Sequence, residues 1–222
     1  AYLMRFLRDN KFTSADEEWV VKESRHERSE EAEQEFHTKA LVTQKAAAEL
    51  AKCFNEEALA LGLEGLPKVS YMTCCFLMTS QMKLRDGEKR DAKEPESRNL
   101  FAERKIEGTF RKWNTNFGAC IETIAAPEQE REDRGGAASS SSAGKTSKLS
   151  SDLIPQAFSH FTIEFSQRPK SGFFGPSGKR GSVLVCDLQG CYDKKLNTFL
   201  LSDPAIHSDL GQECLFGPTD RG

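Results

Sequence analysis

The stretch SVLVCDLQGCYDKK, residues 182–195, passes from an apolar run to polar residues in a single step. The run Val183–Cys186 is short and apolar and contains β-branched residues, which predicts a buried strand. Asp187 and Gln189 follow it directly. Because they lie two positions apart, a continuing strand would project both side chains to the same side. A buried strand that ends on a carboxylate and an amide indicates either a turn or half of a metal site.

Two more polar residues stand where strands are expected to end. Lys22 closes the apolar triplet Trp19–Val21, and Asp203 comes shortly after the run Phe199–Leu201 and precedes a proline. Carboxylates suit Mg²⁺, which proteins bind through one or two carboxylates together with substrate phosphates. A lysine can neutralise those phosphates, and an aspartate can take the proton of an acceptor hydroxyl. Together these residues predict phosphoryl transfer, although a single strand-end aspartate is more often a turn former or a helix cap.

The composition limits the classes of protein that fit. With 222 residues, the chain is long enough for one large domain or two small lobes. A net charge of −3 implies no strongly basic face for nucleic acid, and no run of 18 or more apolar residues predicts a membrane span. The seven cysteines form no CxxC pair, and residues 1–10 do not have the pattern of a signal peptide. These features predict free thiols and a cytoplasmic location.

The periodicity of apolar residues predicts a mixed α/β fold. Spacings of three, four and seven predict a long helix from about Glu30 to Leu61, ended by Gly62. Residues 68–78 indicate a central strand or a hairpin. The other predicted segments are strands at 1–6, 17–24, 99–113 and 182–190, a helix followed by a strand at 153–165, and a polar loop at 191–198.

Three charged or low-complexity segments, 84–98, 125–152 and 167–181, predict surface insertions that are largely disordered. The second contains AGKT, which suggests a phosphate-binding loop. That motif requires a glycine where this chain has Ser139, and no strand precedes it. We therefore expect a flexible serine-rich loop there.

Two other kinds of site can be drawn from the cysteines and histidines. A nucleophilic pair could combine Cys186 or Cys191 with His160 or His207, but nothing in the spacing supports it. A zinc site could combine the two histidines with Cys191 and Cys214, but these residues lack the close spacing of zinc ligands. Both are kept as minor alternatives.

Several ordered motifs resemble those of a known family. In the second half of the chain they are IPQAFSHFT at 154–162, VLVCDLQG at 183–190, LSDPAIHS at 201–208 and FGPTDRG at 216–222. Upstream they are WVVKES at 19–24, LAKCFNE at 50–56 and FAERKIEGTFRKWNTNFG at 101–118. The chain resembles the alpha-kinases, atypical protein serine/threonine kinases that transfer the γ-phosphate of ATP to a protein. The resemblance implies a two-lobed α/β kinase-like fold with an ATP cleft between an N-lobe at about 1–100 and a hinge and C-lobe at 101–222.

The resemblance also implies which residues bind the nucleotide. Lys22 would contact the ATP phosphates. Main-chain groups of Glu103 and Ile106 would bind adenine at the hinge between the lobes. Lys112, in FRKWN, matches a family lysine near the nucleotide, and Gln189 would lie close to the bound ATP.

Catalysis and metal binding are implied for residues of the C-terminal motifs. Asp187 would be the catalytic aspartate, and Gln189 and Asp203 would ligate Mg²⁺. His160, in FSHFT, matches one of four zinc ligands in the family. The other three would lie beyond the last residue of this chain, so we do not expect it to bind zinc. A histidine packed in the core is the other explanation for His160.

The chain departs from the family pattern in ways that the structure can test. Asp203 lies 16 residues after Asp187, a longer interval than the family usually has. The glycine-rich loop that covers the phosphates and the zinc module are not in the sequence. The glutamate that would pair with the nucleotide-binding lysine can be any of Glu31, Glu33 and Glu35. These departures keep a second hypothesis open, an inactive pseudokinase or nucleotide-binding scaffold.

Overall fold

The computed structural model describes residues 2–5, 7–8, 11–12, 18–22, 28–79, 98–121, 153–169, 181–209 and 215–220. The predicted insertions at 84–98, 125–152 and 167–181 fall almost entirely outside these ranges. The AGKT segment and Cys214 lie outside them as well.

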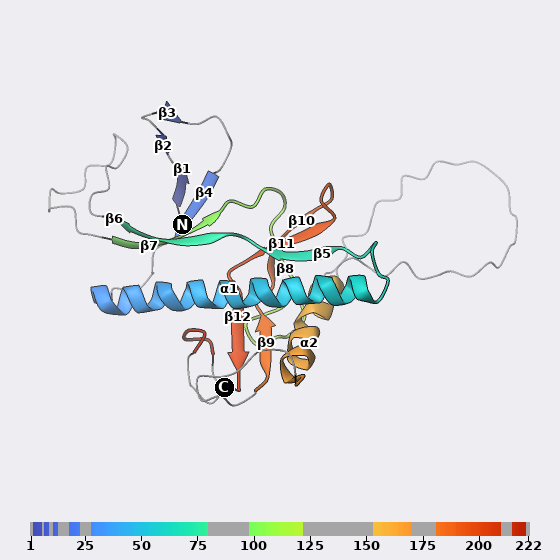
Figure 1. The fold of residues 1–222 in the computed structure, drawn as a ribbon. Helices are drawn as coiled ribbons and strands as arrows, with labels where there is room; N and C mark the ends of the chain where they lie inside the picture. The colour runs from blue at the N-terminus through green and yellow to red at the C-terminus, as the bar shows by residue number, and fades with distance from the viewer. Residues whose placement is uncertain are drawn as a thin grey trace, which may run out of the picture.

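The first part of the chain forms a four-stranded antiparallel sheet (Figure 1). Its strand order is β1 (Tyr2–Arg5), β4 (Glu18–Lys22), β7 (Arg98–Arg104) and β6 (Cys74–Thr79). Val21, Leu100 and Ala102 are buried together in a small apolar core beside it. A short ribbon of β2 (Leu7–Arg8) and β3 (Lys11–Phe12) follows β1. The strands predicted at 1–6 and 17–24 are therefore confirmed.

The long helix α1 (Glu30–Ala60) agrees with the predicted helix to within one residue. Ser29 caps it by accepting a hydrogen bond from the backbone N–H of Ala32 at 3.3 Å. Three glutamates in the first turn place negative charge where the helix dipole favours it. The helix ends at Ala60, and Gly62, just past the cap residue Leu61, has a φ of +74° in the left-handed region that favours glycine.

A second sheet and a strand pair carry the rest of the chain. The sheet has the order β5 (Lys68–Tyr71), β11 (Thr198–Ser202), β10 (Gln189–Asp193) and β8 (Arg111–Lys112), with β5 parallel to β11 and the other pairs antiparallel. The antiparallel pair of β9 (Val183–Cys186) and β12 (Ala205–Ser208) is packed against α2 (Leu153–Gln167). Figure 1 shows α1 crossing the molecule, with β5, β6 and β7 on one side and β9, β12 and α2 on the other.

The main apolar core lies where α1 meets these layers. Leu50 and Phe54 of α1 are buried in one cluster with Phe158 of α2, Phe199 of β11 and Ile206 of β12. Fully burying a leucine or phenylalanine stabilises a fold by about 1.5–3 kcal/mol, so this cluster holds β11 and β12, the strands on either side of Asp203, against the two helices.

The predicted change from helix to strand within 153–165 is wrong, because α2 is one continuous helix. Its buried residues Ile154, Phe158 and Thr162 recur every four positions. This helical period outweighs the strand propensity of the aromatic and β-branched residues in its second half.

Two other expectations near the C-terminus need correction: one segment prediction is half wrong, and the helix-cap alternative for Asp203 does not hold. The polar loop predicted at 191–198 is strand over half its length, since β10 continues to Asp193 and β11 begins at Thr198, and the turn covers residues 194–197. Asp203 and Pro204 do not begin a helix, because Ala205 is the first residue of β12. In both places, pairing with a neighbouring strand supplies the backbone hydrogen bonds that local sequence does not reveal.

The segment predicted as a strand or a hairpin at 68–78 contains two strands that belong to different sheets. β5 pairs with β11, and β6 pairs with β7. β7 also crosses the lobe boundary expected at about residue 100, and that boundary stays a prediction. Neither helix of the described part of the chain is both long and apolar enough to cross a membrane.

Candidate active site

The polar residues predicted at strand ends lie at two junctions where the chain leaves a strand abruptly. Asp187 separates β9 from β10, and Asp203 separates β11 from β12. Both have left-handed backbone conformations, with φ of +57° and +49°, which aspartate tolerates better than most residues. The expected continuous strand from Asp187 to Gln189 is therefore wrong, because the backbone turns at Asp187 and a new strand begins at Gln189.

A neighbouring segment holds the backbone at Asp187 in this conformation. The N–H of Asp187 donates to the carbonyl of Thr115 at 3.2 Å, and the N–H of Trp113 donates to the carbonyl of Leu188 at 2.8 Å. Between them, the fully buried side chain of Asn114 accepts from the N–H of Leu188 at 2.7 Å. These bonds satisfy backbone groups that would otherwise be buried without partners, and they fix the direction of the Asp187 side chain.

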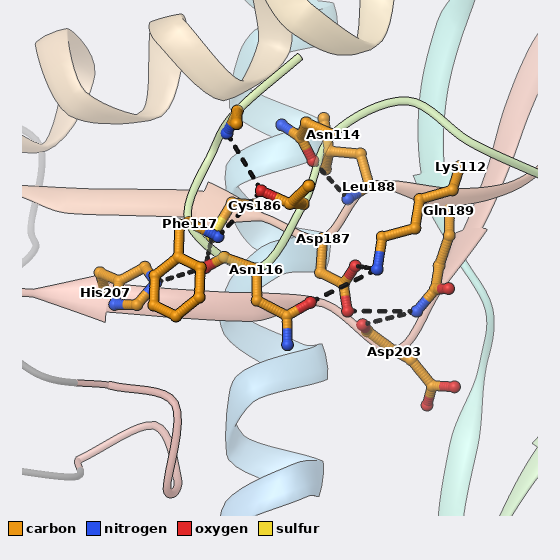
Figure 2. Close-up of polar contacts among 12 residues, drawn as sticks. Lys112, Asn114, Asn116, Phe117, Cys186, Asp187, Leu188, Gln189, Asp203 and His207 are labelled. Atoms are coloured by element: carbon orange, nitrogen blue, oxygen red, sulfur yellow. Dashed lines mark hydrogen bonds and ion pairs between the residues drawn. The ribbon is translucent and has the colours of Figure 1, made fainter. Parts of the chain in front are cut away.

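Three polar side chains surround the Asp187 carboxylate (Figure 2). Lys112 forms an ion pair with Oδ1, and the amide of Gln189 lies 3.5 Å from Oδ2. With its amide nitrogen facing Asp187, Asn116 donates to Oδ2 at 2.8 Å and to Oδ1 at 3.0 Å. The opposite orientation, drawn in Figure 2, would place the amide oxygen against the carboxylate oxygens, although it also lies 3.4 Å from Lys112 Nζ. Electrostatic repulsion disfavours that orientation.

The β10–β11 hairpin brings Asp203 beside Gln189. Gln189 is opposite Ser202 in the register, and its amide nitrogen lies 3.4 Å from the backbone oxygen of Asp203. The turn of the hairpin, at residues 194–197, lies at the far end, where Asp193 accepts from two backbone N–H groups. The 16-residue interval between Asp187 and Asp203 is thus taken up by the β10–β11 hairpin and does not separate the two acids.

Lys22 bridges the two sheets at this site. Its ammonium group lies 2.5 Å from Glu103 Oε1 in the first sheet and 2.5 Å from Asp203 Oδ2 beyond the second sheet. The glutamates expected to pair with it, at positions 31, 33 and 35 of α1, are not its partners, and Glu35 pairs with Lys39 at 2.8 Å. The ion-pair partner of Lys22 therefore comes from β7 and not from the helix.

Glu103 is a carboxylate in an unusual setting. Only 5% of the residue is exposed. Burial raises the pKa of Glu103, and the nearby charge of Asp203 raises it further, whereas the Lys22 ammonium group acts in the opposite direction. The ammonium group therefore helps to keep the buried carboxylate ionised.

Comparison with protein families shows where the chain belongs. The family model described as the alpha-kinase family matches residues 1–222. The chain belongs to the alpha-kinase family. A search of curated proteins found no match to this alpha-kinase chain.

Solved structures with the same fold are alpha-kinase domains. They include that of myosin-II heavy chain kinase A in complex with AMP-PNP (21% identity, TM-score 0.55), the inactive domain of myosin heavy chain kinase A in complex with ATP (19%, 0.54) and a C-terminally truncated domain of myosin heavy chain kinase (22%, 0.54). Each match covers 93% of this alpha-kinase chain but only 55%, 56% and 57% of the respective neighbour. The chain therefore spans little more than half the length of these structures, and at these identities the likeness shows the fold.

The alpha-kinase chain offers oxygen donors that fit a magnesium ion. The carboxylate of Asp203 is about half exposed, at 45%, and lies beside Gln189. Because the amide nitrogen of Gln189 faces Asp187 and the Asp203 backbone, its amide oxygen is the atom that can face a cation. A carboxylate and an amide oxygen, completed by phosphate oxygens, are ligands that Mg²⁺ prefers.

The described part of the alpha-kinase chain does not fit zinc. His160 is exposed on α2, with 73% of its side chain accessible and Nδ1 3.7 Å from Glu164 Oε1. The alternative of a histidine packed in the core is therefore wrong. No group of three or more histidine, cysteine, aspartate or glutamate residues that could hold a metal occurs among the described residues.

A cysteine–histidine nucleophile is excluded for Cys186. Burial, together with the charge of Asp187, raises the pKa of Cys186 to about 11, whereas a nucleophilic cysteine needs a lowered pKa. Its thiol donates to the carbonyl of Asn116 at 3.0 Å, and Nε2 of His207 lies 2.5 Å from the same carbonyl oxygen. Cys186 and His207, which both contact the Asn116 carbonyl, therefore hold a turn in place. Burial raises the pKa of Cys191 too.

The remaining predicted residues are placed as follows. Glu103 lies near the end of β7, and Ile106 lies in the connection from β7 to β8, half-buried. Lys112 lies in β8 directly opposite Gln189. The sequence analysis did not single out Asn114 and Asn116, whose signal is the two side-chain amides of the segment NTN.

Replacing Lys22 with methionine is expected to destabilise the fold more at pH 8 than at pH 5. Because Glu103 has a raised pKa, the folded protein binds its proton more tightly than the unfolded chain does, so stability falls as pH rises from the ordinary value of 4.5 through the raised pKa. Without Lys22, the pKa of Glu103 in the folded protein rises further, so the pH range over which stability falls extends to higher pH. We expect a loss of about 2 kcal/mol at pH 8 and a clearly smaller loss at pH 5, measured by urea unfolding at both values.

The matched control is Lys105→Met. Lys105 pairs with Glu18 at the opposite end of β4, in a more exposed position. Replacing Lys105 should lower the free energy of unfolding little at either pH. In the double variant Lys22→Met, Glu103→Gln, the loss of stability should no longer depend on pH. An equal loss at pH 5 and pH 8 in Lys22→Met would contradict the account of Glu103.

Proposed function

We propose that this chain carries the phosphoryl-transfer site of an alpha-type protein serine/threonine kinase, which moves the γ-phosphate of ATP to a hydroxyl group of a protein. The observation that carries the proposal is the meeting of Asp187, Gln189 and Asp203 with two lysines at one junction of two sheets. Nucleotide complexes of neighbouring alpha-kinase domains support ATP as the donor.

In this proposal, Asp187 acts as the proton acceptor. The acceptor oxygen forms a bond to the γ-phosphorus while the bond from that phosphorus to the β–γ bridging oxygen breaks, and ADP leaves with the electron pair. The hydroxyl proton passes to the Asp187 carboxylate. Asn116 and Lys112 hold that carboxylate in one orientation, so little reorganisation is needed when the acceptor arrives.

Positive charge near the phosphates comes from two directions. Lys112 approaches from β8 and Lys22 from β4, so a triphosphate between them would contact both ammonium groups. Magnesium, when bound by Gln189 and Asp203, supplies further neutralisation of the triphosphate. Lys22 would then exchange its ion pair with Asp203 for a phosphate contact, while Glu103 keeps it directed toward the site.

The proposal is tested by incubating the purified protein with ATP labelled at the γ-phosphate and a panel of unstructured protein substrates. We expect label on serine or threonine after acid hydrolysis, and dependence on Mg²⁺. ATP binding without any transfer would support the pseudokinase or scaffold hypothesis instead. Absence of both ATP binding and transfer would contradict both hypotheses.

Replacing Asp203 with asparagine is expected to raise the magnesium concentration needed for half-maximal transfer by roughly tenfold or more, because the site loses its anionic ligand. The measurement is a magnesium titration of the transfer rate at saturating ATP. Asp193→Asn is the matched control, since Asp193 lies on the same hairpin at the turn end and its oxygen still accepts the turn hydrogen bonds after the change. An unchanged magnesium requirement in Asp203→Asn would rule out Asp203 as a ligand.

A further inference from the structure

Phe117 has an aromatic side chain that is exposed to solvent near the proposed catalytic aspartate. Its exposed fraction is 73%, the largest among the exposed large apolar side chains of the described residues. Phe117 follows Asn116, whose amide contacts the Asp187 carboxylate. A single exposed phenylalanine is common on protein surfaces, so a role for Phe117 has to be argued from the residues around it.

The turn that carries Phe117 is well ordered. The hydroxyl of Thr115 accepts from the N–H groups of Phe117 at 3.3 Å and Ala119 at 3.2 Å, and the carbonyl of Thr115 accepts from the N–H of Gly118 at 2.9 Å. Gly118 has a φ of +76°, which lets the chain turn back. The backbone of Phe117 is thus fixed before any ligand arrives.

The ring of Phe117 is also fixed from one side. It stacks on the imidazole of His207, with ring centroids 6.2 Å apart and an interplanar angle of 20°. His207 is itself held by the contact between Nε2 and the Asn116 carbonyl, which also accepts from Cys186. One face of the phenylalanine ring is therefore covered, and the opposite face is available to another molecule.

The surface around the ring is apolar. Leu184 of β9 is the cross-strand partner of His207, so their side chains share one face of the strand pair. Leu184 is partly buried, and its Cδ2 would lie 3.7 Å from a Cβ added at Gly118. Phe117, His207 and Leu184 form what we call the Phe117 platform.

The platform lies on the side of the site where an acceptor would approach. Figure 2 shows Phe117 and His207 on one side of Asn116, and Lys112, Gln189 and Asp203 on the other. The latter residues face the proposed nucleotide and metal. Because attacking and leaving oxygens are roughly in line at phosphorus, the acceptor hydroxyl must come from the side away from ADP.

We propose that the Phe117 platform binds an apolar side chain next to the phosphorylated residue of the protein substrate. The proposal rests on the proposed kinase function and adds a determinant of substrate choice. An apolar side chain is favoured because the platform offers ring and leucine surface. The rigid turn lowers the entropy cost of docking.

The test compares peptides with one acceptor serine that differ only at one flanking position, which carries leucine, alanine or arginine. At the position that meets the platform, the wild-type protein should phosphorylate the leucine peptide with a kcat/KM about tenfold above that of the alanine peptide. In Phe117→Ala this ratio should fall to about one, and in Phe117→Leu it should be intermediate. The KM for ATP should be unchanged in both variants.

Leu196→Ala is the matched control, because Leu196 is similarly exposed, at 64%, in the turn of the β10–β11 hairpin. It should keep the wild-type ratio. A ratio that survives in Phe117→Ala, or a wild-type preference for arginine that Phe117→Ala removes, would overturn the platform while transfer itself continues. If the wild-type protein phosphorylates no peptide and no protein, the proposed function falls, and the platform falls with it.

Discussion

Asp187→Asn is expected to lower kcat for phosphate transfer about 1,000-fold while ATP affinity changes little. An amide cannot accept the proton of the acceptor hydroxyl, and proton transfer by a positioned side chain contributes about 10²- to 10⁴-fold to such reactions. The asparagine has the same shape as the aspartate, so the backbone bonds to Thr115 and Asn114 that hold the turn should remain. Single-turnover rates at saturating ATP measure the effect directly.

Two measurements separate this effect from loss of structure. The circular dichroism spectrum and the ATP affinity of Asp187→Asn should match those of the wild-type protein. Asp209→Asn, which removes an exposed carboxylate just after β12, should transfer phosphate at the wild-type rate. If Asp187→Asn stays within threefold of the wild-type kcat, Asp187 is not the proton acceptor and the proposed mechanism fails.

Gly190→Ala is expected to destabilise the fold by more than about 4 kcal/mol, an exceptional loss for one methyl group. Gly190 has a φ of +151°, and a Cβ built there would lie 2.0 Å from the backbone oxygen of Leu200. That oxygen belongs to the neighbouring strand β11 and cannot rotate away as a side chain could. The two strands must separate next to Gln189, so transfer activity should be lost along with stability.

Thermal unfolding followed by circular dichroism measures the first effect, and Gly65→Ala provides the control. Gly65 has no atom within 4 Å of an added Cβ and no left-handed φ, so alanine there should leave stability within about 0.5 kcal/mol of wild type. A Gly190→Ala protein that unfolds at the wild-type temperature would show that β10 and β11 do not approach as closely as described.

The polar residues at strand ends could be found from the sequence because each follows an apolar run within a few positions. Lys22, Asp187, Gln189 and Asp203 do lie together. The expectation that a continuing strand projects Asp187 and Gln189 to the same side was wrong, however, because the left-handed backbone at Asp187 interrupts the strand. Their proximity comes from that turn, which no alternation of residues reveals.

The partner of Lys22 could not be chosen from the sequence because it depends on which strands pair. Glu103 lies 81 positions away and becomes a diagonal neighbour once β4 and β7 align, with Lys22 opposite Phe101. The sequence did not distinguish among the three glutamates of α1, which were expected because a helix near the strand is the usual source of such a partner. The register of two distant strands is a property of the whole fold and leaves no local pattern.

Helix and strand assignments failed where tertiary pairing outweighed local preference. Polar residues made β10 look like a loop, yet it is an inner strand between β8 and β11. In α2, by contrast, the four-residue repeat of buried side chains was present in the sequence but was obscured by residues typical of strands. The contact of His207 could not be predicted for a different reason, since its partner is the backbone carbonyl of Asn116 in a turn.

The β10–β11 hairpin has a consequence for how sequences of this kind can change in length. Its site end is anchored by Gln189 and Ser202, whereas its turn end projects away from the anchored pair. Adding or removing one residue on each strand preserves the pairing and the faces of the side chains between the change and the site end, so such paired changes leave the two acids where they are. A change of a single residue forces a bulge or reverses the faces. We therefore expect natural variation in the interval between the two acids to occur in even steps.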